Sequence, residues 1–172
     1  MLQRPSPADY PSFFSPYIEK VPDGAILDLM DEQTEELGRF FGRLTPEQAD
    51  YRYAPGKWSV KEILGHLIDG ERIFAYRALR FARNDSTDLP GFDQDPYVVA
   101  GRFSARSMQS LLDEFLPLRR SDTVLFRSLS EDELNRSGTI DGRSITVHAL
   151  TYILVGHILH HTEVLREKYR LG

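Results

Sequence analysis

Four long segments of this sequence have apolar residues at every third or fourth position, and this spacing limits the fold more than any other feature. In the first segment Ile26, Met30 and Leu37 follow the spacing, which places apolar side chains on one face of an α-helix. Convincing strand patterns are absent. Four amphipathic helices of about 20 residues predict an all-α fold, a four-helix bundle. The predicted helices are residues 24–44, 59–83, 104–128 and 144–169.

Capping signals mark where several helices begin. Ser59 is followed three residues later by Glu62, and Thr45 by Gln48. In such a capping box each side chain accepts a hydrogen bond from the other residue's backbone N–H. Ser130 stands before three acidic residues and caps another short helical turn.

The connections between the helices are rich in turn-forming residues. Residues 84–101 hold many Asp, Pro and Gly and predict a loop. Residues 138–144 predict a turn region, with a small hairpin around Asp141-Gly142 as one option. Pro117 lies inside the third predicted helix, where it removes a backbone hydrogen bond, so we expect a kink or a break.

Residues 1–22 carry five of the ten prolines. Because proline fixes φ and removes a hydrogen-bond donor, this segment predicts an extended N-terminal arm rather than a helix. Its aromatic residues suggest that the arm packs on the body. The remaining residues, 23–172, fit a single four-helix-bundle domain, since one domain commonly spans about 100–200 residues.

The charge and the residue types present exclude several classes of function. The net charge is −5, which argues against a nucleic-acid partner because phosphate contacts need a basic surface. The chain has no cysteine, so thiolate metal sites and cysteine nucleophiles are excluded. No signal peptide and no membrane span are recognisable. We therefore expect a soluble, cytoplasmic protein.

The five histidines can be placed by angle, since each helical residue advances about 100°. His157 and His161 fall on the apolar face of the last helix, whereas His148 points away and His160 lies at the edge. Two imidazoles at i and i+4 are spaced so that one helix can offer two ligands to a metal. His66, on the flank of the second helix, is a candidate third ligand. Alternatively His157 and His161 are core histidines and His66 is exposed.

Acidic residues of the second helix are candidates for supporting roles. Glu71 falls inside the apolar stripe, so its carboxylate must be paired or hydrogen-bonded. It either orients a ligating imidazole or forms an ion pair with an arginine, and the ion pair is the favoured alternative. Asp69 and Glu62 lie within a turn of His66 and are candidate fourth ligands, although capping and solvation explain them equally well.

Three residues of the 84–101 loop are candidates for a wall of the substrate site: Asp93, Asp95 and Tyr97. The alternative is a plain connection with turn residues. The arginines that recur along the second helix are expected to form a solvated face rather than an anion site. They are Arg72, Arg77, Arg80 and Arg83.

Two motifs make the chain resemble the DinB-like, or YfiT-like, superfamily of four-helix-bundle proteins. They are APGKWSVKEILGHLID, which begins at Ala54, and GHILHH, which begins at Gly156. The loop LPGFDQD from Leu89 is similar to a subgroup, and the resemblance covers nearly the whole chain. It implies a divalent metal bound by His66, His157 and His161, with His160 as a non-ligand neighbour. It also implies a homodimer.

Three neutral imidazoles with an open position form the catalytic type of zinc site. Zinc, nickel, manganese and iron are all compatible with such ligands. The superfamily includes enzymes that use low-molecular-weight thiols, and a cysteine-free chain must take its thiol from a cofactor or substrate. Our first hypothesis is therefore a metal-dependent enzyme for thiol (S-)transfer to a small-molecule substrate, or related detoxification. The alternatives are a metal-dependent hydrolase and a non-catalytic ligand-binding or dimerising bundle with a structural or vestigial metal.

Overall fold

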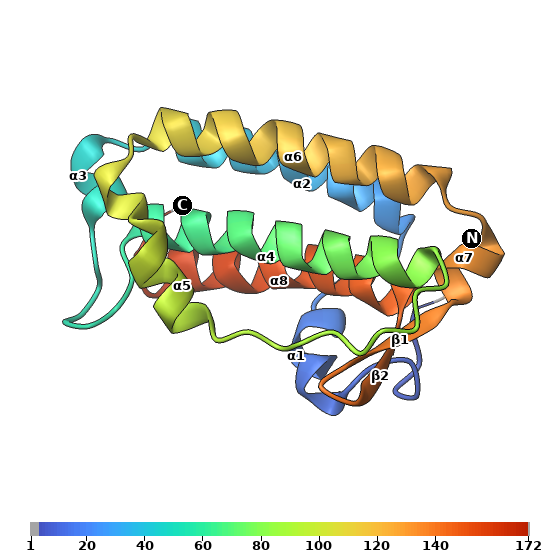
Figure 1. Cartoon of the computed structure of the whole chain (residues 1–172). Coiled ribbons are helices and arrows are strands. Elements are labelled where there is room, and N and C mark those ends of the chain that lie inside the picture. The colour runs from blue at the N-terminus through green and yellow to red at the C-terminus, as the bar shows by residue number, and fades with distance from the viewer. Residues whose placement is uncertain (1–3, 172) are drawn as a thin grey trace.

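Four long helices form the bundle in the computed structural model, which describes residues 4–171 (Figure 1). The predicted four-helix bundle is confirmed, with a small two-stranded sheet added to it. Around the bundle α2 packs on α6, α6 on α4, and α4 on α8. The four helices are α2 (Ile26–Gly42), α4 (Val60–Ala82), α6 (Met108–Ser128) and α8 (Val147–Glu167).

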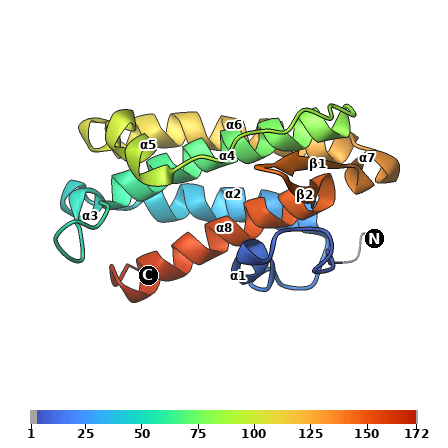
Figure 2. The same ribbon diagram turned by 60° about the horizontal axis from the view of Figure 1, so that its bottom comes forward.

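The direction of the helices requires one long connection. Helices α2 and α8 run one way, and α4 and α6 run the other, so the neighbours α4 and α6 are parallel (Figures 1 and 2). Parallel neighbours cannot be joined by a tight turn, so the chain between them returns along the bundle. This connection contains α5 (Gln94–Gly101) and a 3-10 turn, η2 (Phe103–Ala105).

The predicted capping boxes are all present. Ser59 and Glu62 form the box that begins α4, and Thr45 and Gln48 form the box that begins α3 (Pro46–Asp50). A third box, with Ser130 as its first residue, begins α7 (Glu131–Asn135). These local signals are readable from sequence because both partners lie within four residues of each other.

The predicted hairpin around Asp141-Gly142 is confirmed. Strands β1 (Ser137–Ile140) and β2 (Arg143–Thr146) pair antiparallel, with Ile140 opposite Arg143. Both turn residues have positive φ, 48° at Asp141 and 71° at Gly142, as a two-residue hairpin loop requires. Thr146 then caps α8, so the last helix begins at Val147, three residues later than predicted.

Two helix boundaries and the effect of Pro117 differ from the sequence expectations. The 84–101 loop contains α5, whose start the Asp93 side chain caps. The third long helix begins at Met108 rather than Ser104, because Ser107 provides the cap. α6 continues through Pro117 without a break. A proline removes only one backbone bond, and packing on α2 and α4 holds the turns on both sides.

The N-terminal segment is not wholly extended, which corrects the prediction for part of it. A 3-10 turn, η1 (Ser12–Phe14), leads into α1 (Ser15–Ile18). Pro16 stands in the first turn of α1, where its missing N–H needs no helical partner. Phe14 and Ile18 are buried, and α1 packs on α8, as the aromatic content of the arm suggested. Residues 1–3 lie outside the described residues.

The apolar core forms two clusters that meet along α8. Val155 belongs to the cluster that includes α1 and the hairpin, and Ile158 belongs to the cluster around α2, α6 and the start of α4. His157 lies between these two residues on the same helix. No helix within residues 4–171 has both the length and the apolar character required to cross a bilayer.

Gly156 allows α1 to lie against α8, and this gives a test of the arm's packing. A Cβ at position 156 would stand 2.0 Å from the backbone oxygen of Tyr17, so Gly156→Ala must push the two helices apart. We expect unfolding in denaturant to show a loss of about 1–3 kcal/mol.

Gly42→Ala is the matched control, since its Cβ would meet Leu112 at an ordinary 3.9 Å. That variant should be as stable as the native protein or slightly more stable. Equal stability of the two variants would contradict the close packing of α1 on α8.

Candidate metal centre

Two adjacent helices, α4 and α8, bring three histidines together. α4 supplies His66, and the adjacent α8 supplies His157 and His161 one turn apart. His66 is 2% exposed and His157 is 5% exposed, while His161 is partly buried. His66 was placed on a helix flank by angle, yet it faces inward because α4 touches both α6 and α8.

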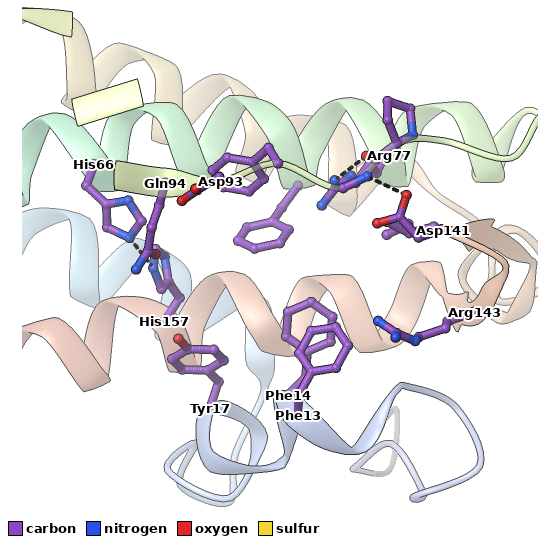
Figure 3. A pocket seen from close by; sticks show the side chains of 15 residues that line it. Phe13, Phe14, Tyr17, His66, Arg77, Asp93, Gln94, Asp141, Arg143 and His157 are labelled. Atoms are coloured by element: carbon purple, nitrogen blue, oxygen red, sulfur yellow. Dashed lines mark hydrogen bonds between the residues drawn. The ribbon is translucent and has the colours of Figure 1, made fainter. Parts of the chain in front are cut away.

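The Nε2 atoms of the three imidazole rings converge on one point. The Nε2 atom of His66 lies 2.9 Å from Nε2 of His157, which lies 3.1 Å from Nε2 of His161. One ligand atom from each ring lies within 4.8 Å of the others. Figure 3 shows His66 and His157 turned toward each other at one end of a cavity.

This arrangement fits a metal ion. Nitrogen ligands at about 2.0–2.1 Å and tetrahedral angles stand about 3.3 Å apart, close to the two distances between the Nε2 atoms. A neutral imidazole has one donor and one acceptor nitrogen, so three converging Nε2 atoms cannot all be satisfied by one another. A cation would satisfy all three lone pairs.

The environment keeps the three imidazoles neutral, which is the form that binds metal. Burial lowers the pKa of His66 to about 4, with a contribution from His160. Burial and the neighbouring imidazoles lower the pKa of His157 and of His161 well below the usual value. In residues 4–171 no carboxylate hydrogen-bonds any of the three rings.

Aromatic rings and one glycine position these imidazoles. The ring of Trp58 lies 4.9 Å from that of His66, and the ring of Tyr17 lies edge-on to His157 at 5.5 Å. Trp58 is partly buried and packs against the core cluster at this end. Gly70 makes room for His157, because a Cβ there would stand 3.1 Å from the His157 ring.

The other two histidines lie outside the cluster. His148 is buried against Tyr152 with ring centroids 5.1 Å apart, a long way along α8 from His157. His160 is half-buried, and its ring meets Tyr17 at 5.4 Å. Both residues were expected to be non-ligands, and neither contributes to the three-histidine group.

The acidic candidates of α4 hold other positions. Glu62 accepts from the Ser59 backbone and forms an ion pair with Arg52, so its oxygens serve the helix cap. Asp69 is partly buried, which raises its pKa, and its charged neighbours are Arg72 and Glu114 rather than the imidazoles. Neither residue reaches the histidine cluster as a fourth ligand.

The three loop candidates are dispersed around the site. Asp93 lines the cavity that His66 and His157 enter, and Asp95 lines a smaller pocket beside His161. Tyr97 is 48% exposed and packs on Phe92 with ring centroids 5.3 Å apart, so it supports the wall from outside.

Glu71 forms the ion pair that was the favoured alternative. Its Oε2 atom accepts from Arg119 at 2.7 Å, and both side chains are almost fully buried. Arg119 also donates to Gln33, whose amide donates to the backbone oxygen of Val155. Asp122, one turn after Arg119, faces the Glu71 carboxylate. Glu71 therefore belongs to a buried network on the inner side of the histidine cluster.

A cavity of about 710 Å³ opens beside the histidines (Figure 3). Its lining includes Arg77, which contradicts the expectation of a solvated arginine face, because this side chain is 5% exposed. Arg77 follows His66 by eleven residues, slightly more than three whole turns, so the two share a face of α4. That angular relation was readable from sequence. The contributions of Phe14 and Arg143 were not, because they depend on tertiary packing.

Comparison with known proteins assigns the family. The sequence profile of the DinB superfamily matches residues 29–165. The chain belongs to the DinB superfamily. The resemblance inferred from the two histidine motifs is thereby confirmed.

Solved structures share the fold of this DinB-superfamily protein. YfiT from Bacillus subtilis, described as "a probable metal-dependent hydrolase with an unusual four-helix bundle topology", has a TM-score of 0.72 at 20% identity. The match covers 94% of this chain and 97% of that one. A mycothiol-dependent maleylpyruvate isomerase has a TM-score of 0.67 at 14% identity, over 84% of this chain and 61% of that chain.

A sequence relative comes from Oceanobacillus iheyensis and carries the name "putative metal-dependent hydrolase". It is 27% identical over 74 residues, and the match spans 42% of this chain and 42% of the relative. Under half of the length of each protein is therefore compared in this case.

From this geometry we expect His66, His157 and His161 to hold a metal ion in this DinB-superfamily protein. Titration with zinc, nickel or manganese, followed by elemental analysis, should give about one ion per native chain. His161→Ala should lose the ion or bind it at least about tenfold more weakly, because a ligand is removed. His160→Ala, the neighbouring control, should bind like the native protein. Equal binding by both variants would contradict the assignment.

The free energy of unfolding should depend on pH through the carboxyl group of Asp122. Its partial burial and the charge of Glu71 raise its pKa to about 7, so folding disfavours the ionised form. A raised pKa in the folded state gives stability that is present in acid and lost as pH rises toward about 7.

Asp122→Asn should therefore gain stability relative to the native protein between about pH 4.5 and about pH 8. We expect a gain of about 1 kcal/mol, or about 2–4 °C in Tm, because partial exposure weakens the effect. Thermal unfolding of both proteins across this range measures the difference, and the comparison cancels the shared contribution of the histidines. Parallel curves would contradict the raised pKa.

Proposed function

We propose that this protein is a metal-dependent enzyme that transfers a low-molecular-weight thiol to an electrophilic small molecule. His66, His157 and His161 would hold one divalent ion. The observation that carries the proposal is the convergence of three neutral imidazoles, two of which, His66 and His157, line a cavity of about 710 Å³. Cavities of about 300–1,000 Å³ are typical of small-molecule sites.

A divalent ion held by these three histidines would supply acidity, since it would lower the pKa of a thiol bound there and favour the thiolate at neutral pH. The chain itself supplies three neutral ligands and leaves further positions open to the cavity. Thiol transfer fits the residues present because a thiol made acidic in this way needs no general base. In residues 4–171 no carboxylate contacts the three rings, and the chain has no cysteine of its own.

The rings around the histidines support this chemistry. Tyr17 and Phe74 cover the exposed edge of His157, with ring centroids 5.5 Å and 5.9 Å away. Such a wall excludes water from the reacting atoms and favours attack by sulfur over attack by water. The mycothiol-dependent isomerase with the same fold is consistent with a thiol as co-substrate.

A metal-dependent hydrolase is the second candidate. Two of the similar proteins carry this description. The Asp93 carboxylate lines the same cavity as His66 and His157, and a carboxylate there could act as a general base toward water.

A two-part assay distinguishes the candidates. Protein loaded with zinc, nickel or manganese is mixed with chlorodinitrobenzene and one of three thiols, mycothiol, glutathione or cysteine. In the transfer a C–S bond forms, the C–Cl bond breaks, and the thiol proton and chloride are released. The same protein is tested with nitrophenyl esters and no thiol.

We expect metal-dependent thioether formation that His161→Ala reduces at least about tenfold, because removing a ligand removes the acidity of the bound thiol. His160→Ala should retain the activity. Ester hydrolysis that needs the metal and Asp93, without thioether formation, would favour the second candidate and overturn the first.

A further inference from the structure

Arg77 is a buried cation that forms no ion pair within residues 4–171. It is 5% exposed, and its recorded hydrogen bond runs from Nη2 to the backbone oxygen of Pro90 at 2.7 Å. Within residues 4–171 no carboxylate oxygen lies within 4.0 Å of its guanidinium nitrogens. A guanidinium stays protonated even when buried, and an unpaired buried charge is costly.

Arg143 stands at the same end of the cavity on strand β2. Its guanidinium lies 5.7 Å from the ring centre of Phe13, and it has no recorded ion pair within residues 4–171. Figure 3 shows Arg77 and Arg143 at one end of the cavity and His66 with His157 at the other. The two arginines therefore mark a positive end opposite the candidate metal centre.

Among the residues that line the cavity, Asp141 is the carboxylate beside the arginines, and it does not neutralise both of them. Asp141 accepts a hydrogen bond from the Gly91 backbone N–H at 3.0 Å, which holds it at the hairpin turn. Burial lowers the pKa of Arg77 and the negative charge of Asp141 opposes this shift, although the two side chains lie farther apart than an ion pair. Among the residues that line this end of the cavity, two cations against one carboxylate leave a net positive charge. Asp88, which accepts from the Gly142 backbone N–H at 3.1 Å, is not part of this lining.

Between the two ends the walls are aromatic. The Arg77 guanidinium lies 5.9 Å from the ring centre of Phe74 and 5.8 Å from that of Phe92, and Phe14 faces Phe74 at 6.1 Å. These rings form an apolar slot that continues from the histidines to the arginines. The Cα atoms of His66 and Arg77 are about 16 Å apart along α4, so a molecule that reaches both ends must be elongated.

We propose that the cavity selects an elongated substrate with an aromatic or otherwise apolar body and a carboxylate group, which Arg77 and Arg143 bind. The assignment of the opposite end of this substrate as the electrophile rests on the proposed function. An arginine can bind a carboxylate through two parallel hydrogen bonds, and such a contact would supply the anionic partner that Arg77 lacks.

Binding of an unreactive probe tests this without any turnover. Phenylhexanoate and its neutral analogue phenylhexanamide are titrated into the metal-free protein by calorimetry at low salt. We expect the carboxylate to bind at least about tenfold more tightly than the amide. Arg77→Met should abolish this preference while keeping most of the side-chain volume, and Arg143→Met should reduce it.

Arg72→Met is the matched control, because Arg72 lies on the same helix, is half exposed and pairs with Glu114. It should keep the full preference for the carboxylate. Arg143 is exposed, so its variant reports on the pocket even if Arg77→Met fails to fold. Equal binding of acid and amide by the native protein, or an unchanged preference in both Arg77→Met and Arg143→Met, would overturn the proposal.

The outcome is separate from that of the proposed function. A carboxylate preference that depends on the arginines, in a protein without thiol transfer, would support the anion end and reject the transferase. Thiol transfer to neutral electrophiles without any carboxylate preference would do the reverse.

Discussion

Arg119 joins the four long helices through one buried network. From α6 it donates to Glu71 of α4 and to Gln33 of α2, both at 2.7 Å, and Gln33 donates to the backbone of Val155 on α8. These hydrogen bonds form only when all four helices have the right register, and losing one partner leaves a buried charge uncompensated. Val155 stands two residues before His157, so the network also fixes the height at which α8 presents its histidines.

The second constraint is the direction of α4 and α6. Because these neighbours are parallel, the chain between them must return along the bundle, and it passes beside α4 (Figures 1 and 2). Pro90, Phe92 and Asp93 on this connection become one wall of the cavity, and the arm with α1 becomes another. The cavity is therefore a consequence of the topology, and helix packing alone would not have produced it.

The cavity joins two kinds of unsatisfied polar group. In the part of the chain that the structure describes, the Nε2 atoms of three neutral imidazoles have only each other as partners at one end, and Arg77 has no carboxylate at ion-pair distance at the other. Buried polar groups are normally paired, so each end has the character of a ligand site. A cation at the histidines and an anion at the arginines would complete both, with aromatic rings between them.

The sequence by itself determined the helices, their caps and the histidine pair at i and i+4, because these depend on residues a few positions apart. It also placed Glu71 on a buried face, where an ion pair was favoured. Only the tertiary structure decided that His66 faces α8, that Arg119 is the partner of Glu71, and that Arg77 is buried. These outcomes depend on which helices are neighbours and on the path of the connection of some 25 residues between α4 and α6. Neither is encoded by a pattern of residues a few positions apart. The short helix in the proline-rich arm followed the same rule, since its packing against Gly156 joins positions far apart in the chain.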